Sequence, residues 1–186
     1  MKYLFLVAAA VFAFSMTATA QSSKSIDVSK SSINWTGKKV TGSHTGTINI
    51  SEGELEFNNG RLSGGSFTID MATIVTTDLS GDMKGKLEGH LKSDDFFGVE
   101  TYPTAQLKIT NVGPGEGGYS VTADLTIKGK TAPVTFLAKM EGGKATAEIT
   151  VDRTNYDVRY GSGKFFDNLG DRMIYDNFDL VVQLVH

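Results

Sequence analysis

A two-residue repeat of apolar and polar side chains recurs along most of the chain. It is clearest between residues 119 and 128, where Tyr119, Val121, Ala123, Leu125 and Ile127 alternate with polar residues. This period indicates strands with one buried face and one face in water. We predict about eight such strands, and the same alternation marks the others at residues 33–35, 48–57, 67–71, 105–109, 132–140, 145–151 and 178–184.

The breaks between these segments are short and carry residues typical of tight turns. They are Asn58-Asn59-Gly60, the run from Gly113 to Gly118, Lys128-Gly129-Lys130, and Gly142-Gly143. Glycine and asparagine accept the positive φ angles that tight hairpins require, and short connections make neighbouring strands antiparallel. The pattern therefore predicts an all-β fold, an antiparallel eight-stranded barrel. At that strand number the interior is either filled by side chains or holds one small ligand, and the pattern alone leaves both open.

Two segments depart from the alternation and are expected to form short helical caps. Between Asp82 and Leu91, apolar side chains recur every four residues, which places them on one face of a helix. The segment from Gly161 to Asp171 has a similar mixture of apolar, small and charged residues. We expect both segments to cover an end of the barrel.

The N-terminal residues 1–20 have the pattern of a secretory signal peptide. Lys2 precedes an apolar run of about a dozen residues, and Ala18-Thr19-Ala20 forms a small-x-small site that predicts cleavage after Ala20. The remaining residues 21–186 fit a single domain. No later segment reaches the length of a membrane-spanning helix, so we expect a soluble protein without stable membrane insertion.

The amino-acid composition limits the cellular compartment and the classes of binding partner that we expect. The chain has no cysteine, so disulfides, thiolate metal sites and a lipid-modified cysteine after Ala20 are excluded, and we predict a free periplasmic or secreted protein that is not a lipoprotein. Without Lys2 the chain carries 17 basic and 21 acidic residues. The absence of a dense basic stripe makes nucleic acid an unexpected partner.

Motifs that suggest catalysis or a cofactor lack their structural context. The run from Gly113 to Gly118 matches a dinucleotide fingerprint, but a strand follows it instead of the helix that would bind the pyrophosphate. The spacing of His44, His90 and His186 does not support a zinc site. His90 lies near Ser93, Asp94 and Asp95 in sequence, but no nucleophile elbow accompanies them. We therefore predict no catalytic residues, no metal and no cofactor.

Three arginines follow the predicted strand that ends at Asp152. Arg153, Arg159 and Arg172 could bind carboxylates of neighbouring loops and close the barrel end, or could contact the head of a ligand. We favour the structural role.

The order of motifs along the chain resembles the YceI-like polyisoprenoid-binding proteins. The most specific stretch runs from Leu87 through His90 to Phe96-Phe97 and is followed by Tyr102-Pro103. The resemblance extends over nearly all of residues 21–186. Its other matching stretches are Trp35-Thr36-Gly37-Lys38, Gly42-Ser43-His44-Thr45-Gly46, Gly64 to Met71, Leu125 to Gly129, and Asp152-Arg153-Thr154-Asn155-Tyr156.

The resemblance implies a lipocalin-like barrel in the periplasm that binds a long isoprenoid chain, either a polyprenol or an isoprenoid quinone, without catalysis. The lipid would be the protein's ligand and main partner; whether the chain forms a homodimer is left open. Two alternatives remain: a hydrolase or isomerase of an apolar substrate that uses His90, and an envelope stress-related β module with a solid core and no lipid. From strand parity and position in the cap, we expect the lipid tunnel to involve Trp35, Phe67, Ile69, Leu87, Leu91, Phe97, Leu125, Ile127 and Phe136, with His90 or Tyr102 near the headgroup.

Overall fold

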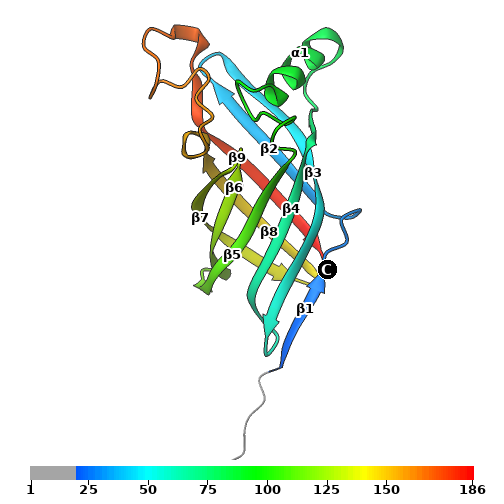
Figure 1. Ribbon diagram of the computed structural model, residues 1–186. Helices are drawn as coiled ribbons and strands as arrows, with labels where there is room; N and C mark the ends of the chain where they lie inside the picture. Colours follow the sequence, from blue (N-terminus) through cyan, green and yellow to red (C-terminus); the bar gives the residue numbers. More distant parts are fainter. Residues whose placement is uncertain (1–19) are drawn as a thin grey trace, which may run out of the picture.

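Nine strands and one α-helix make up the part of the chain, residues 20–186, that the computed structural model describes (Figure 1). The predicted signal peptide, apart from Ala20, lies outside these residues. The elements are β1 (Gln21–Ser25), β2 (Ser32–Lys39), β3 (Gly42–Asn58), β4 (Arg61–Thr76), α1 (Gly81–Lys92), β5 (Thr104–Gly115), β6 (Gly118–Ile127), β7 (Lys130–Glu141), β8 (Lys144–Asp152) and β9 (Ile174–Val185), with short 3-10 turns η1 (Arg153–Tyr156) and η2 (Gly170–Arg172).

The strands form one closed antiparallel barrel. Their order is β1-β3-β2-β9-β8-β7-β6-β5-β4, and pairing between β3 and β4 closes the circle. β2 pairs with β3 at residues 42–48, whereas β1 pairs with the same strand at residues 54–58. Because β1 and β2 follow one another along one edge of β3, the barrel has eight strand positions, and the predicted eight-stranded antiparallel fold is confirmed.

Two-residue turns connect the hairpins, as their sequence predicts. Asn59 and Gly60 have φ angles of 51° and 77°, and Lys128 and Gly129 have φ angles of 51° and 69°. Positive φ at both central residues gives the turn a twist that matches the flanking strands. These turns fix the register of the strands that they join.

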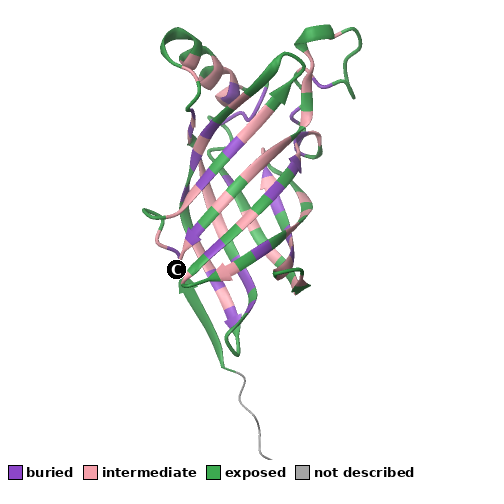
Figure 2. Ribbon diagram, turned by 180° about the vertical axis from the view of Figure 1, so that it is seen from behind, coloured by how far each residue is buried: buried purple, intermediate pink, exposed green. Residues whose placement is uncertain are grey.

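Burial alternates along the strands as the hydrophobic pattern predicts (Figure 2). In β6, Val121, Ala123, Leu125 and Ile127 are buried, and Asp124 between them is exposed. Inward-facing residues of the other strands join the same hydrophobic core.

Helix α1 and the segment 153–173 lie together at the upper end of the barrel in Figure 1, whereas β1 and the C-terminus lie toward the lower end. The predicted helix at 82–91 is confirmed. Glu88 of α1 accepts a hydrogen bond from the backbone N–H of Thr76, the last residue of β4, at 2.8 Å. This bond attaches the helix to the barrel rim.

The prediction of a second helical cap, from Gly161 to Asp171, is wrong. This segment forms turns and bends, and only η2 at Gly170–Arg172 is helical. Gly161, Asn168 and Gly170 adopt left-handed φ angles of 63°, 58° and 54°, which interrupt a right-handed helix. Within residues 20–186, no helix is both long enough and apolar enough to cross a membrane.

Candidate functional site

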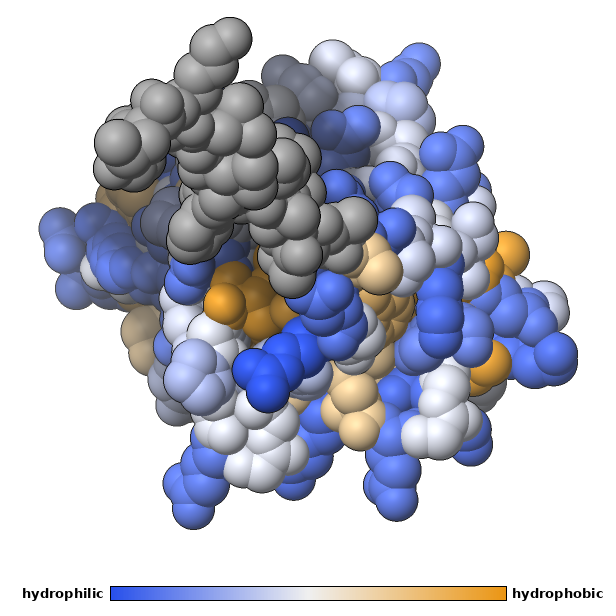
Figure 3. Space-filling view, turned by 90° about the horizontal axis from the view of Figure 1, so that it is seen from below, coloured by the Kyte–Doolittle hydropathy of each residue, from blue (hydrophilic) through white to orange (hydrophobic). Residues whose placement is uncertain are grey.

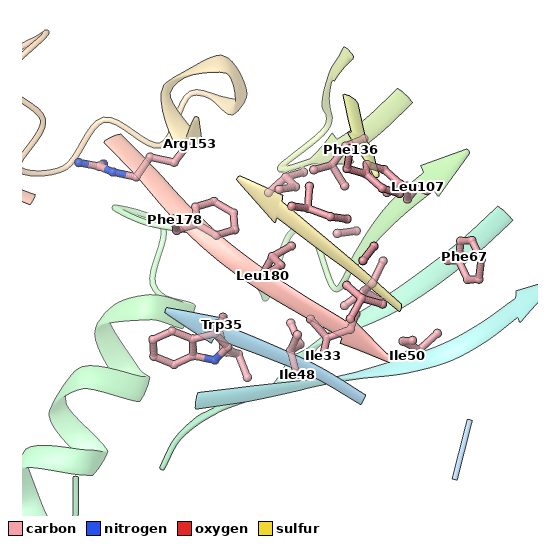
Figure 4. A pocket seen from close by; sticks show the side chains of 18 of the residues that line it. Ile33, Trp35, Ile48, Ile50, Phe67, Leu107, Phe136, Arg153, Phe178 and Leu180 are labelled. Carbon is pink, nitrogen blue, oxygen red and sulfur yellow. The ribbon is translucent and has the colours of Figure 1, made fainter. Parts of the chain in front are cut away.

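The barrel interior contains an apolar cavity of about 200 Å³. Side chains from strands β2 to β9, and Leu91, Phe96, Phe97 and Arg153 from the upper end of the barrel, form its wall, and the surface that they present to the cavity is entirely apolar (Figure 4). Lining residues run from Leu62 and Leu184 toward the lower end to Phe96 and Ile174 toward the upper end, so the cavity follows the barrel axis. The solid-core alternative predicted no such space.

Eight of the residues expected to form the tunnel line this cavity. Phe67 and Ile69 enter from β4, and Leu125 and Ile127 enter from β6. Because each pair is separated by two positions, both members face the same side of the sheet. The structure brings together Trp35, Phe67, Ile69, Leu91, Phe97, Leu125, Ile127 and Phe136 around one space.

The other three expected residues lie outside the cavity wall. Leu87 is partly buried on α1 and packs against the core. The His90 ring lies 4.4 Å from the Tyr160 ring and 5.5 Å from the Phe96 ring, measured between centroids, in the cap above the cavity. Tyr102 is 37% exposed and lies beside the turn at Gly129. Their roles in lipid binding remain predictions.

The structure adds further apolar residues to the wall. They face inward by the same parity as the expected residues, so the signal was present in the sequence, but the alternation alone does not show which inward residues border empty space. The additional residues include Ile33, Ile48, Ile50, Met71, Leu107, Phe178 and Leu180.

A glycine positions the single tryptophan at the upper part of the cavity. Trp35 pairs with Gly46 across β2 and β3, and its Nε1 donates a hydrogen bond to the Thr47 carbonyl oxygen at 3.3 Å. A Cβ atom at Gly46 would lie 2.4 Å from the indole ring. The absence of a side chain at Gly46 therefore allows the indole to lie against β3 and form part of the wall.

Two adjacent phenylalanines cover the upper end of the cavity. The rings of Phe96 and Phe97 meet edge to face, with centroids 4.9 Å apart, and both residues are buried. This arrangement is favourable for aromatic pairs and adds to the stabilisation from burial. The sequence after α1 thus supplies an apolar lid beneath the helix.

Arg153 is 2% exposed and holds the upper end of the barrel together. Its guanidinium donates hydrogen bonds to the carbonyl oxygens of Tyr175 at 3.2 Å, Val158 at 2.8 Å and Ile174 at 3.0 Å. Figure 4 shows its guanidinium turned away from the apolar side chains of the cavity. These contacts give Arg153 a structural role, as expected, but its hydrogen-bond partners are backbone carbonyl oxygens instead of the carboxylates expected from the sequence, and the nearest carboxylate, of Asp176, lies 3.6 Å away.

Burial is the largest influence on the Arg153 guanidinium and lowers its pKa, whereas the nearby Asp176 and Asp152 carboxylates act in the opposite direction. Arginine remains charged in proteins at neutral pH. The charge is therefore retained next to an apolar cavity because backbone oxygens and two carboxylates surround it.

Asp78 connects the loop before α1 to β3. Its carboxylate accepts hydrogen bonds from the Thr76 hydroxyl at 2.6 Å and the Thr45 N–H at 3.1 Å, and it pairs with His44 Nδ1 at 2.8 Å. Burial alone would raise the pKa of Asp78, but the hydrogen bonds from Thr76, His44 and Thr45 outweigh it and lower the pKa from 3.8 to about 2. The ionised carboxylate therefore stabilises this corner of the cap.

We expect stability to depend on Asp78 at low pH. A carboxyl group whose pKa is lower in the folded state stabilises the fold above its unfolded pKa and loses this effect as pH falls through the folded pKa. The contribution of the Asp78 carboxylate to the free energy of unfolding should thus be present above pH 3.8 and disappear toward about pH 2. Urea unfolding across this range should show a smaller acid-induced loss for Asp78→Asn than for the wild type. Asp124→Asn, on the exposed outer face of β6, is the control, and equal pH dependence of all three proteins would contradict the assignment.

The described residues contain no cluster of three or more histidine, cysteine, aspartate or glutamate side chains suited to a metal ion. His90 Nε2 is buried and has no hydrogen-bond partner within residues 20–186. The hydroxyl of Ser93 donates to the backbone oxygen of His90, at 2.8 Å, instead of to its ring. The sequence neighbours of His90 are therefore not arranged as a nucleophilic triad.

Comparison with protein families gives one match over most of the chain. The model of the YceI-like domain matches residues 25–186. Among individual proteins, a UPF0312 protein of Pseudomonas putida is 38% identical over 87 residues, which are 42% of this chain and 45% of that protein. A UPF0312 protein of Shewanella denitrificans is 30% identical over 98 residues, 52% of this chain and 49% of its own length. The chain matches about half the length of these relatives.

Solved structures show the same architecture. The crystal structure of BcnA from Burkholderia cenocepacia has a TM-score of 0.66 and 25% identity, and the match covers 87% of this chain and 99% of that one. A polyisoprenoid binding domain from Saccharophagus degradans, implicated in plant cell wall breakdown, has a TM-score of 0.56 and 14% identity, with 90% and 97% covered. The second likeness concerns the fold alone.

Proposed function

The chain belongs to the YceI-like family, and from this premise we propose that it is a non-enzymatic periplasmic carrier that holds the chain of an isoprenoid lipid, a polyprenol or an isoprenoid quinone, inside its barrel. The observation that carries the proposal is the cavity along the barrel axis with an entirely apolar surface. Each methylene group that enters such a space contributes roughly 0.8 kcal/mol to binding. An apolar chain is therefore held without specific polar contacts.

The size of the cavity limits the length of the lipid chain that fits inside it. Its volume of about 200 Å³ is only somewhat larger than the engineered cavity of roughly 150 Å³ that admits benzene. A long isoprenoid thus needs additional space. Met71 and Met140 line the wall, and the unbranched methionine side chain adapts readily to a new shape. We propose that rearrangement of such side chains lengthens the tunnel when the lipid enters.

Apolar side chains also lie at the lower end of the barrel. Figure 3 shows apolar side chains visible at this end between polar surface residues. The fold of the Saccharophagus degradans polyisoprenoid binding domain and the predicted export signal support the same proposal. The inferred tunnel residues are those that line the cavity, with Leu87, His90 and Tyr102 as outer contacts.

The proposal is tested on protein purified from its native envelope. Native mass spectrometry should show one isoprenoid lipid per chain, and organic extraction should release the same compound. The protein mass should correspond to a chain that begins at Gln21 if export removes residues 1–20. Reproducible recovery of the lipid-free mass alone, under conditions that preserve a known lipid complex, would reject the carrier function.

A further inference from the structure

The pairing between β2 and β9 is interrupted near the upper end of the barrel. Gly37 pairs with Phe178, and the next pair is Lys39 with Ile174. Between these two pairs β2 advances by two residues and β9 by four, so β9 contains two extra residues. Extra residues in one strand disrupt the local ladder and bend the strand away from its partner.

Exposed residues border the cavity at this interruption. Lys38, Tyr175 and Asn177 border the cavity, although inward-facing residues form nearly all of the wall. Tyr175 is 48% exposed and Asn177 is also exposed. Gly37 has no neighbouring atom within 4 Å of the place where a Cβ atom would lie. A side opening in the barrel wall accounts for these observations together.

The edges of the opening are fixed. Arg153 binds the carbonyl oxygens of Ile174 and Tyr175, which lie beyond the last residue of β9 that pairs with β8. On the outer face, the Lys38 ammonium pairs with Asp179 at 2.7 Å, and Asp179 also accepts a hydrogen bond from Thr150 at 2.8 Å. The opening therefore does not depend on a loose strand end.

We propose that the interruption between β2 and β9 is the headgroup site. A small uncharged head with an acceptor oxygen, such as an alcohol or a ring ketone, lies there beside Lys38, Tyr175 and Asn177, while the lipid chain fills the cavity. This inference rests on the proposed carrier function. The interior offers no polar surface, and burial of an unpaired polar head there would be costly. The exposed side chains of Asn177, Tyr175 and Lys38 carry amide, hydroxyl and ammonium donors on the outer side of the barrel wall, where a head at the opening would meet them.

Charge favours an uncharged head over a phosphate. Lys38 is already balanced by Asp179, and the charge of Arg153 is directed to backbone oxygens and Asp176. A phosphate group would bring about two negative charges beside Lys38 and Arg153, whose charges are already matched, which leaves Lys39 at the edge of the interruption as a single lysine to balance both. An alcohol or ketone needs only hydrogen bonds.

The test compares three probes that share a nine-unit isoprenoid chain: the alcohol, the hydrocarbon without the hydroxyl group, and the phosphate monoester. We expect wild-type protein to bind the alcohol about fivefold to tenfold more tightly than the hydrocarbon, which is the effect of one hydrogen bond. Asn177→Leu and Lys38→Met should reduce this preference, whereas the hydrocarbon affinity stays within about twofold of wild type. The matched controls Gln183→Leu on β9 and Lys139→Met on β7 change exposed residues away from the opening and should retain the preference.

A second measurement locates the head directly. Because the chain has no cysteine, a single nitroxide label can be attached at Val40→Cys, next to the opening, or at Glu116→Cys, in the opposite hairpin. The signals of an isotope-labelled alcohol head should broaden with the first label and not with the second. The reverse pattern, or an unchanged preference in both Asn177→Leu and Lys38→Met, overturns the headgroup site. Tighter binding of the phosphate overturns the uncharged head, and failure of wild-type protein to bind any probe overturns the carrier function itself.

Discussion

Replacement of Ala147 by tryptophan should abolish lipid loading while the barrel remains folded. Ala147 lies on β8 and lines the cavity, so an indole at this position occupies space that the isoprenoid chain needs. If about four methylene groups are displaced at roughly 0.8 kcal/mol each, the affinity falls by a hundredfold or more. Native mass spectrometry and titration with a nine-unit polyprenol measure this loss.

The adjacent strand position supplies the control for this variant. Glu148 follows Ala147 on β8 and is exposed on the outer face. Because consecutive residues of a strand point to opposite faces, Glu148→Trp adds the same ring outside the barrel. It should bind lipid as the wild type does. Equal lipid content in folded Ala147→Trp and Glu148→Trp proteins would show that the lipid is not held in the cavity.

The eight-stranded fold could be predicted because the information lies in local parity and turn chemistry. The alternation in β6 requires one buried face, and the Asn59-Gly60 turn requires a tight hairpin. Helix α1 was predictable from apolar residues repeated every four positions. The segment 161–171 contains similar residue types, but Gly161, Asn168 and Gly170 adopt left-handed backbone conformations that interrupt a helix, and residue type alone does not determine these conformations.

The candidate site was less predictable than the fold. Parity correctly placed Phe67, Ile69 and Leu125 inside the barrel, but parity does not distinguish a side chain in solid packing from one beside a cavity. The interruption opposite Lys38 could not be predicted from the sequence either, since the two extra residues of β9 become apparent only when its pairing with β2 is known. Sequence periodicity describes one strand, whereas a cavity and a gap are properties of several strands together.

Replacement of Arg153 by leucine should produce the largest loss of stability. Three carbonyl oxygens, on Tyr175, Val158 and Ile174, would lose their donors, and the Asp176 carboxylate would lose the cation 3.6 Å away. Breaking a buried charged arrangement from one side costs about 3–5 kcal/mol, because the remaining polar groups stay buried without partners. For a chain of this size, this corresponds to a decrease in Tm of roughly 6–20 °C. Thermal unfolding followed by circular dichroism measures it.

Two further variants separate the geometry of Arg153 from its charge. Arg153→Lys keeps the positive charge but cannot reach three carbonyl oxygens in the planar arrangement of a guanidinium, so its stability should lie between those of the wild type and Arg153→Leu. Arg159 is exposed and pairs with Asp157 on the surface, and Arg159→Met should cost less than about 1 kcal/mol because surface ion pairs contribute little. A Tm for Arg153→Leu as high as that of Arg159→Met would mean that the carbonyl oxygens of β9 find other donors. The upper end of the barrel would then be held mainly by the packing of Phe96 and Phe97, and the edge of the opening between β2 and β9 would be free to move.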